Sequence, residues 1–291
     1  MTLRPSICQA DFEREDFYEK CLFTGKAVKK TKHGEHVIPG WLIRDYQLQD
    51  HRIVMGWPGG IANINMFRTR ADFKANNKFG ELEDPIKRGK WTTDTLHLWQ
   101  KKISAGMILC HWHMAQDKYH PERPQKFDNR HLVITLNDFR ADFEKFANGQ
   151  PVPRNGSTLV LPTMLPDGWL AHVFGSAVMD IGKYDALLPF GMLVVTHKGK
   201  LIVSVFHDSD LTFEQSNLQN EWPTENLDTC VDAPRIAAAL ALKYSQFVFK
   251  EQTEGLGHQA TVYDDLLKYI GAQLGLDIDP KTKTYSLRNK T

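Results

Sequence analysis

Three stretches in the first third of the chain decide how its fold is interpreted. Residues 21–25 read CLFTG, residues 32–42 read KHGEHVIPGWL, and residues 76–84 read NNKFGELED. The first contains a turn-forming Thr-Gly pair, and an apolar run in the second stops at a proline. Together they contain two histidines, several carboxylates and two asparagines, which are residue types suited to acid–base chemistry and to hard metal ions.

The pattern between these stretches predicts a hairpin followed by a helix. Residues 52–55 and 61–67 are β-like and are separated by a loop rich in glycine. From residue 69 to about residue 79 the spacing of apolar residues fits a short helix.

These stretches resemble the HNH nuclease family, whose ββα-metal fold joins a β-hairpin to a helix around one divalent cation. Many members carry a Glu-His-Val/Ile-Ile-Pro segment, which is complete here at residues 35–39. The Asn-Asn-Lys-Phe-Gly…Asp segment that opens the helix is also present, at residues 76–84. The resemblance covers roughly residues 21–84, about a fifth of the chain.

The resemblance implies a role for each residue of the motif. His36 would be the general base that deprotonates water, because the unperturbed pKa of histidine is close to neutral. Glu35 would be a metal ligand, and Asn76 would complete the protein ligands from the helix start, with Asn77 in its place if the register slips by one. The expected cation is Mg²⁺ or Mn²⁺, which prefer oxygen ligands.

Four further residues have supporting roles by the same resemblance. Asn63 or Asn65 would brace the loop that carries the histidine. Arg70 and Lys78 would hold the flanking phosphates.

The chain departs from the family at its zinc-binding cysteines. Cys21 is present, but Thr24 stands where its partner should be, and Asp72 and Ala75 hold the positions of the second pair. One cysteine is too few for a structural zinc, so none is expected. Packing of aromatic side chains should replace it, and the available ones are Trp41, Phe67, Phe73 and Phe79.

Further along the chain, amphipathic patterns predict more helices and a β-rich region. One helix starts near Asp94, and a second one has Asn137 as its N-cap. Residues 157–208 look β-rich, with a hairpin around residues 197–200, and helices follow at 234–250 and 262–274. The fold class is therefore α+β. An HNH-like domain at residues 1–95 precedes a mixed α+β domain at 96–291 whose architecture the sequence does not define. The predicted helix that starts near Asp94 has four apolar residues along one stripe: Leu96, Trp99, Ile103 and Met107.

The composition is that of a soluble globular protein. The 291 residues are 42% hydrophobic, and the formal net charge is +1, which argues neither for nor against a polyanionic partner. No apolar run reaches the roughly 18 residues that span a membrane. The charged N-terminus does not fit a signal peptide, and four scattered cysteines suit a reducing compartment, so we expect a cytoplasmic protein.

A second group of potential metal ligands follows the predicted helix at Asp94. On a strand, His111 and His113 would share a face; if the helix continues instead, Cys110, His113, Asp117 and His120 would lie on one stripe. Their spacing matches no standard zinc signature. A different metal enzyme built around His111, His113 and His120 is nevertheless the rival hypothesis.

The sequence therefore predicts a metal-dependent endonuclease that acts on nucleic acid, on DNA rather than RNA by the habit of the family. The C-terminal domain would supply target recognition or oligomerisation, and no membrane partner is expected. The alternative is a catalytically silent relative that binds nucleic acid or protein.

Overall fold

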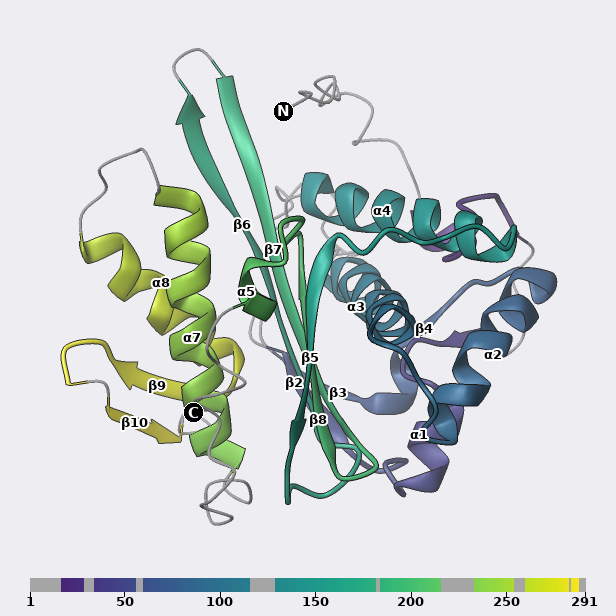
Figure 1. The fold of residues 1–291 in the computed structure, drawn as a ribbon, viewed down its shortest axis with the longest axis horizontal. Helices are drawn as coiled ribbons and strands as arrows, with labels where there is room; N and C mark the ends of the chain where they lie inside the picture. The colour runs from purple at the N-terminus through teal and green to yellow at the C-terminus, as the bar shows by residue number, and fades with distance from the viewer. Residues whose placement is uncertain are drawn as a thin grey trace.

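The computed structural model describes residues 17–28, 34–55, 60–115, 129–181, 184–215, 233–253, 260–282 and 284–287. Helices and small sheets are mixed over this part of the chain, which confirms the α+β class (Figure 1). The largest sheet is antiparallel and has the strand order β5-β8-β7-β6. Its strands are β5 (Gly156–Pro162), β6 (Leu170–Ile181), β7 (Tyr184–His197) and β8 (Lys200–Phe206).

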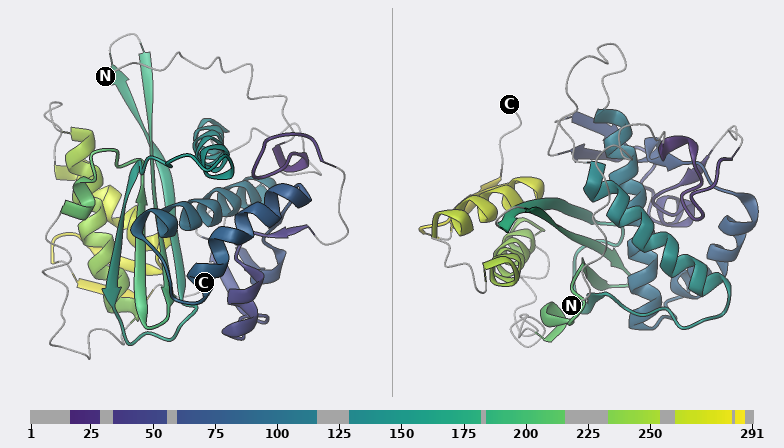
Figure 2. Two further views of the ribbon diagram at one scale, coloured as in Figure 1. Left: turned by 45° about the vertical axis from the view of Figure 1, so that its right-hand side comes forward. Right: turned by 90° about the horizontal axis from the view of Figure 1, so that it is seen from above.

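Helices cover both faces of this sheet, as the view from above in Figure 2 shows. On one face lie α3 (Thr93–Ala115) and α4 (Asn129–Ala147), and on the other lie α7 (Ala233–Thr253) and α8 (Ala260–Gln273). Alternation along β7 divides its side chains: Leu193 faces the first pair of helices, whereas Met192 and Val194 join the core under the second pair. Three short elements complete this half: α5 (Thr212–Gln215), β9 (Leu276–Asp279) and β10 (Thr284–Leu287).

The N-terminal elements pack on the outer side of α3. They are η2 (Phe17–Glu19), β1 (Glu35–His36), α1 (Gly40–Asp45), β2 (Arg52–Met55), β3 (Gly60–Asn63), η3 (Ile64–Met66), β4 (Arg68–Thr69) and α2 (Phe73–Lys87). Strand β1 pairs with β4 in antiparallel register, and the β2–β3 hairpin lies between them in sequence. The chain thus forms a two-stranded ribbon that leads directly into α2.

The predicted helix at residues 69–79 begins later and runs further than expected. Thr69 belongs to β4, and α2 starts at Phe73 because the carboxylate of Asp72 accepts hydrogen bonds from the first-turn amides. The buried side chains of Leu82 and Ile86 extend the apolar stripe to Lys87. The predicted strand at 61–67 is too long, because Asn63 caps a 3₁₀ turn that ends β3.

The long-helix predictions are confirmed in position, and one start is wrong. All four stripe residues of α3 are buried. Asn137 is not an N-cap: it lies inside α4, because the buried side chains of Leu132, Val133 and Leu136 continue the helical pattern upstream. The predicted hairpin around residues 197–200 joins β7 to β8, and the two C-terminal helices are present as α7 and α8.

The apolar core crosses the predicted boundary near residue 95. One cluster joins the N-terminal elements, α3, α4 and one face of the sheet, and a second cluster fills the space between the sheet and α7 and α8. The division at residue 95 stays a prediction. None of the described helices is long and apolar enough to cross a membrane.

Candidate active site

Strand β1 brings the two central motif residues to the ribbon in front of α2. Glu35 pairs with Thr69 and His36 pairs with Arg68 across the antiparallel register. The strand ends at His36, and buried Val37 follows, held by a hydrogen bond from its amide to the carbonyl of Phe67. The backbone around His36 is therefore fixed from both sides.

The imidazole of His36 is half-buried, and no described residue is a hydrogen-bond partner of its Nδ1 atom. Burial, and then the charge of Arg68, lower the pKa of His36, while the adjacent Glu35 acts in the opposite direction. A Cβ placed on Gly40 would lie 3.6 Å from the His36 ring and 3.3 Å from the guanidinium of Arg44. Arg44 and Arg68 are thus cationic neighbours of a neutral imidazole that could accept a proton.

Glu35 contacts a buried lysine from α3. The Nζ atom of Lys102 lies 3.3 Å from Glu35 Oε1 and 3.6 Å from Glu83 Oε1 of α2. It also donates a 2.8 Å hydrogen bond to the carbonyl of His36. Oε1 of Glu35 is therefore engaged inside the protein, so an external ligand would have to bind through Oε2.

The predicted bracing asparagines lie together next to β4. The side chain of Asn63 accepts a hydrogen bond from the amide of Asn65, whose own side chain donates to the carbonyl of Gln49. Nε of Arg68 donates to the carbonyl of Asn65. This turn therefore supports the strand that pairs with His36, and among the described residues none of its hydrogen bonds is to the imidazole.

The helix places Asn76 and Asn77 differently. Asn76 is partly buried, and it lies two helical turns before Glu83 on nearly the same stripe of α2, whereas Asn77 is exposed. The stripe that carries Asn76 is the one that reaches Lys102 through Glu83. Within the described ranges, the Asn76 side chain makes no hydrogen bond to Glu35 or His36.

The two predicted phosphate-binding cations have protein partners. Arg70 forms a 2.6 Å ion pair with Glu19 and donates to the carbonyl of Val28. Lys78 forms a 2.6 Å ion pair with Glu81, one turn further along α2. Their predicted role stays a prediction, and each would have to exchange a carboxylate for a phosphate.

Hydrogen bonds join the two places where the family carries its cysteine pairs. The amide of Asp72 donates to Cys21 Sγ at 3.2 Å, and the amide of Leu22 donates to the carbonyl of Arg70 at 2.8 Å. Arg140 of α4 donates to the carbonyls of Cys21 and Leu22. A guanidinium and a helix cap thus hold the turn against the start of α2.

Three of the four aromatic residues expected to replace zinc are buried, and one expectation is wrong. Trp41, Phe67 and Phe79 belong to the core, and Phe79 contacts Phe23 of the turn with ring centroids 5.3 Å apart. Phe73 is 77% exposed because it is the first residue of α2 and faces away from the stripe that is buried.

Two of the five potential ligands in the second group, Cys110 and His111, lie in the core. The Cys110 thiol donates to the carbonyl of Arg68, and burial raises its pKa to about 12. The ring of His111 packs edge-on against Phe174, and burial lowers its pKa to about 4. His113 is partly buried. Asp117 and His120 lie outside the described residues, as do two of the four cysteines, Cys8 and Cys230.

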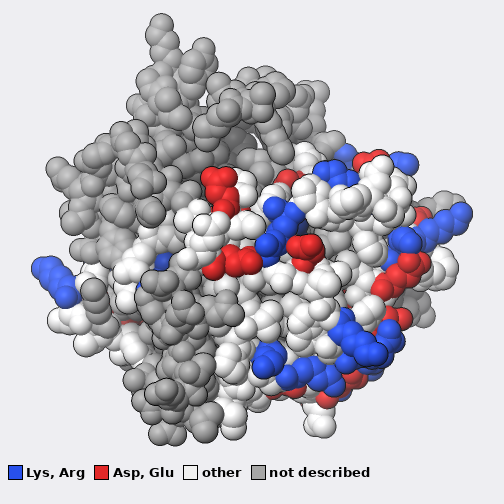
Figure 3. All heavy atoms as spheres, in the orientation of Figure 1, with Lys and Arg blue, Asp and Glu red and all other residues white. Residues whose placement is uncertain are grey.

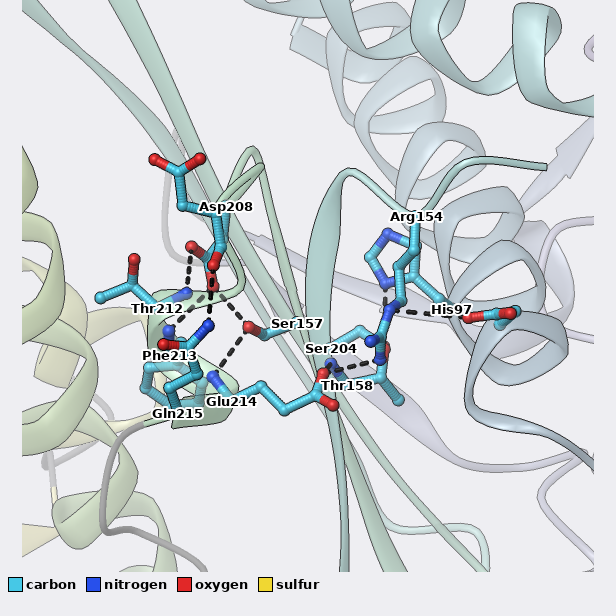
Figure 4. A network of polar contacts seen from close by, with 12 residues as sticks. His97, Arg154, Ser157, Thr158, Ser204, Asp208, Thr212, Phe213, Glu214 and Gln215 are labelled. Atoms are coloured by element: carbon cyan, nitrogen blue, oxygen red, sulfur yellow. Dashed lines mark hydrogen bonds and ion pairs between the residues drawn. The ribbon is translucent and has the colours of Figure 1, made fainter.

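A separate polar network joins α3 to the sheet (Figure 4). The Ser157 hydroxyl donates to Asp208 and accepts from the amide of Glu214, and Asp208 also caps the start of α5. The buried imidazole of His97 is bonded to Thr158 at 2.9 Å, not to Ser157. The serine hydroxyl thus serves capping, and the network does not form a serine–histidine–aspartate relay.

The residues predicted to hold the ion suit a hard divalent cation in chemical type. The Glu35 carboxylate and the Asn76 amide would each offer an oxygen ligand, and among the described residues the buried Nδ1 of His36 has no hydrogen-bond partner. Among the described residues, no three His, Cys, Asp or Glu side chains converge as metal ligands, so such an ion would depend on the amide and on water.

Three neighbours of the motif were not identified from the sequence. The sequence gives a weak indication of Arg44, since it lies one helical turn after Gly40. It gives no indication of Arg68 or Lys102. Strand pairing brings Arg68 to His36, and Lys102 reaches it from 66 residues away along the chain.

On the face shown in Figure 3, the described acidic and basic side chains are interspersed.

Compared with known proteins, the chain matches no family model, no curated protein and no solved structure.

Proposed function

We propose that this protein is a metal-dependent endonuclease of the HNH type, with DNA as the expected substrate and RNA as the alternative. The single observation that carries the proposal is the arrangement of β1, β4 and α2. The Glu35-His36 strand pairs with the segment that leads into the helix, and Cys21 contacts the start of that helix.

In this proposal, neutral His36 accepts a proton from the water that attacks the phosphodiester. A divalent ion held by Glu35 and Asn76 would supply charge stabilisation on the phosphate. Arg44 and Arg68, whose charges act on the imidazole, would orient that phosphate. The sheet and its C-terminal helices would contribute target recognition or oligomerisation.

The test is cleavage by the purified full chain. Supercoiled and linear duplex DNA, single-stranded DNA and RNA are incubated with Mg²⁺ or Mn²⁺, with and without EDTA. His36→Ala should lower the rate about 10²–10⁴-fold, the range for loss of a general base. His51→Ala, which removes an exposed histidine in the loop before β2, is the matched control and should cleave like the wild type.

Two outcomes would reject the proposal. Equal cleavage by wild type and His36→Ala would mean that a contaminant or another site does the chemistry. Lack of cleavage of every substrate by folded wild-type protein would remove the enzymatic assignment.

One observation favours a second candidate, a silent relative that binds nucleic acid or protein. A metal ion that needed Oε1 of Glu35 would have to displace its ion pair with Lys102. For this candidate, nucleic-acid binding without cleavage is expected, and neither EDTA nor His36→Ala should weaken it.

A further inference from the structure

Lys102 is a buried cation whose position calls for an explanation. Its side chain is 0% exposed, and it lies in the part of α3, residues 96–112, that is buried on all sides. Removing an ammonium from water is costly, and the loss is recovered only when good partners surround it. The partners therefore indicate what the residue does.

The partners of Lys102 come from two elements of the candidate site. On β1 they are the Glu35 carboxylate at 3.3 Å and the carbonyl of His36 at 2.8 Å. On α2 they are the Glu83 carboxylate at 3.6 Å and the ring of Phe79, whose centroid is 5.8 Å away. One ammonium thus links the strand that carries the motif to the helix that carries Asn76.

The same face of α3 also holds the residue after His36. A Cβ placed on Gly106, one turn after Lys102, would lie 2.7 Å from Val37 Cγ1. Residues 35, 36 and 37 are therefore all in contact with α3 through Lys102 and Gly106. Because β1 has only two residues, its pairing with β4 alone gives it little support.

We propose that Lys102 is a positioning residue for the endonuclease site: it fixes the His36 backbone and turns Glu35 so that its second oxygen can bind the metal ion. This inference rests on the proposed function. Lys102 is too deeply buried to touch a substrate, so its contribution passes through Glu35 and His36. Loss of such a supporting contact typically weakens metal binding or activity about 10–100-fold.

The neighbouring Lys101 provides the matched control. It is also buried in ion pairs, but with Asp138 and Asp142 of α4, away from β1. Lys101→Met removes the same charge from the same helix without touching a partner of Lys102.

The experiment compares Lys102→Met, Lys102→Arg and Lys101→Met with the wild type. Mn²⁺ binding is measured by calorimetry without nucleic acid, cleavage gives kcat and KM, and circular dichroism checks folding. Lys102→Met should weaken Mn²⁺ binding and lower kcat about 10–100-fold at nearly unchanged KM. Lys102→Arg should recover part of both losses. Lys101→Met should stay within about twofold in Mn²⁺ affinity, since the two sites share no partners.

Defined results would overturn the inference. Folded Lys102→Met with wild-type Mn²⁺ affinity and kcat would show that Lys102 is only structural. Tighter Mn²⁺ binding by this variant would show that Lys102 blocks the metal. If the wild type neither binds Mn²⁺ nor cleaves, the proposed function fails and this inference with it. If the wild type is active and only the Lys102 comparison fails, the proposed function survives.

Should Lys102→Met not fold, Glu83→Gln tests the same link. It keeps the lysine and its bonds to β1 and removes only the charge of the α2 partner. Mn²⁺ affinity and kcat should fall by only about 3–10-fold, which is less than the usual effect of losing a whole supporting contact. Unchanged values in folded Glu83→Gln would reject the link between α2 and β1.

Discussion

Lys101 and Lys102 are consecutive residues of α3, and both are buried, but they serve different parts of the molecule. Lys101 has Asp142 at 2.5 Å, Asn155 at 2.8 Å and Asp138 at 3.1 Å. Lys102 has longer ion pairs, and its shortest contact is with the carbonyl of His36. Because adjacent residues of a helix differ in direction by about 100°, one helix can hold α4 with one lysine and β1 with the next.

The different partners of Lys101 and Lys102 show how a buried charge that stabilises the fold can be distinguished from one that positions the candidate site. The charge of Lys101 is matched by two close carboxylates and an amide, none of them near His36. The charge of Lys102 is shared among acceptors that carry the candidate site. Removing Lys101 should therefore cost mainly folding free energy, and removing Lys102 should cost function as well.

The largest expected effect on stability is that of Lys101→Met. It leaves Asp138 and Asp142 without their counter-ion inside the protein, so the free energy of unfolding should fall by about 3–5 kcal/mol. Urea unfolding followed by circular dichroism measures this change. The control is Lys87→Met, which breaks an exposed 3.5 Å pair with Asp45 and should cost less than about 1 kcal/mol. Equal losses in the two variants would refute the distinction.

The second-largest expected effect is a loss of folding stability in mild acid, caused by His97, which lies near Lys101 on α3. Burial, and then the charge of Lys101, lower the pKa of His97 from 6.5 to about 3. The unfolded chain therefore takes up a proton below pH 6.5 and the folded chain does not, so His97 stabilises the fold above that pH and this stability is lost as the pH falls. The loss should be about 1.4 kcal/mol per pH unit between pH 6.5 and 5.

Unfolding titrations at several pH values measure this slope. His97→Gln should make it shallower by about that amount, whereas His51→Ala, at an exposed position, should leave it unchanged. Parallel curves for His97→Gln and the wild type would mean that His97 does not contribute.

A smaller effect is expected on the Lys102 side, from Gly106→Ala. The added methyl carbon would lie 2.7 Å from the short, branched side chain of Val37. Overpacking of this kind costs about 1–3 kcal/mol, from which a gain in helix propensity of up to about 1 kcal/mol is subtracted. Since Val37 follows His36, the variant should also weaken Mn²⁺ binding, which calorimetry would detect. Unaltered stability and binding would show that α3 does not hold β1 at this point.

The sequence predicted the elements whose information is local. The apolar stripe of α3 is repeated at helical spacing, so its position was readable, and the turn between β7 and β8 carries a clear Lys-Gly signal. Helix starts were less readable. Asn137 looks like a cap in isolation, but the buried residues before it decide that α4 has already begun.

The sequence predicted which residue types form the candidate site, but not which other residues they contact. The motif named Glu35 and His36, but Lys102 looked like an ordinary polar residue on a helix. Its contact with Glu35 joins residues 67 apart and depends on how three elements pack. The register that sets Arg68 against His36 has the same origin, because two-residue strands carry no pattern that defines their partner.

The smallest expected effect is that of Gly80→Ala, which separates the contribution of helix propensity from that of steric contact. Gly80 lies within α2, and a Cβ placed there would have no described atom within 4 Å apart from its own helix backbone and chain neighbours. Gly80→Ala should therefore raise the free energy of unfolding by about 0.5–1 kcal/mol, through helix propensity alone, in the same urea titration. Both glycines are helical and gain the same methyl group, so the difference between Gly106→Ala and Gly80→Ala measures the contact with Val37. If the two variants gained equal stability, close packing of α3 would not explain how β1 is held, and Lys102 alone would have to account for it.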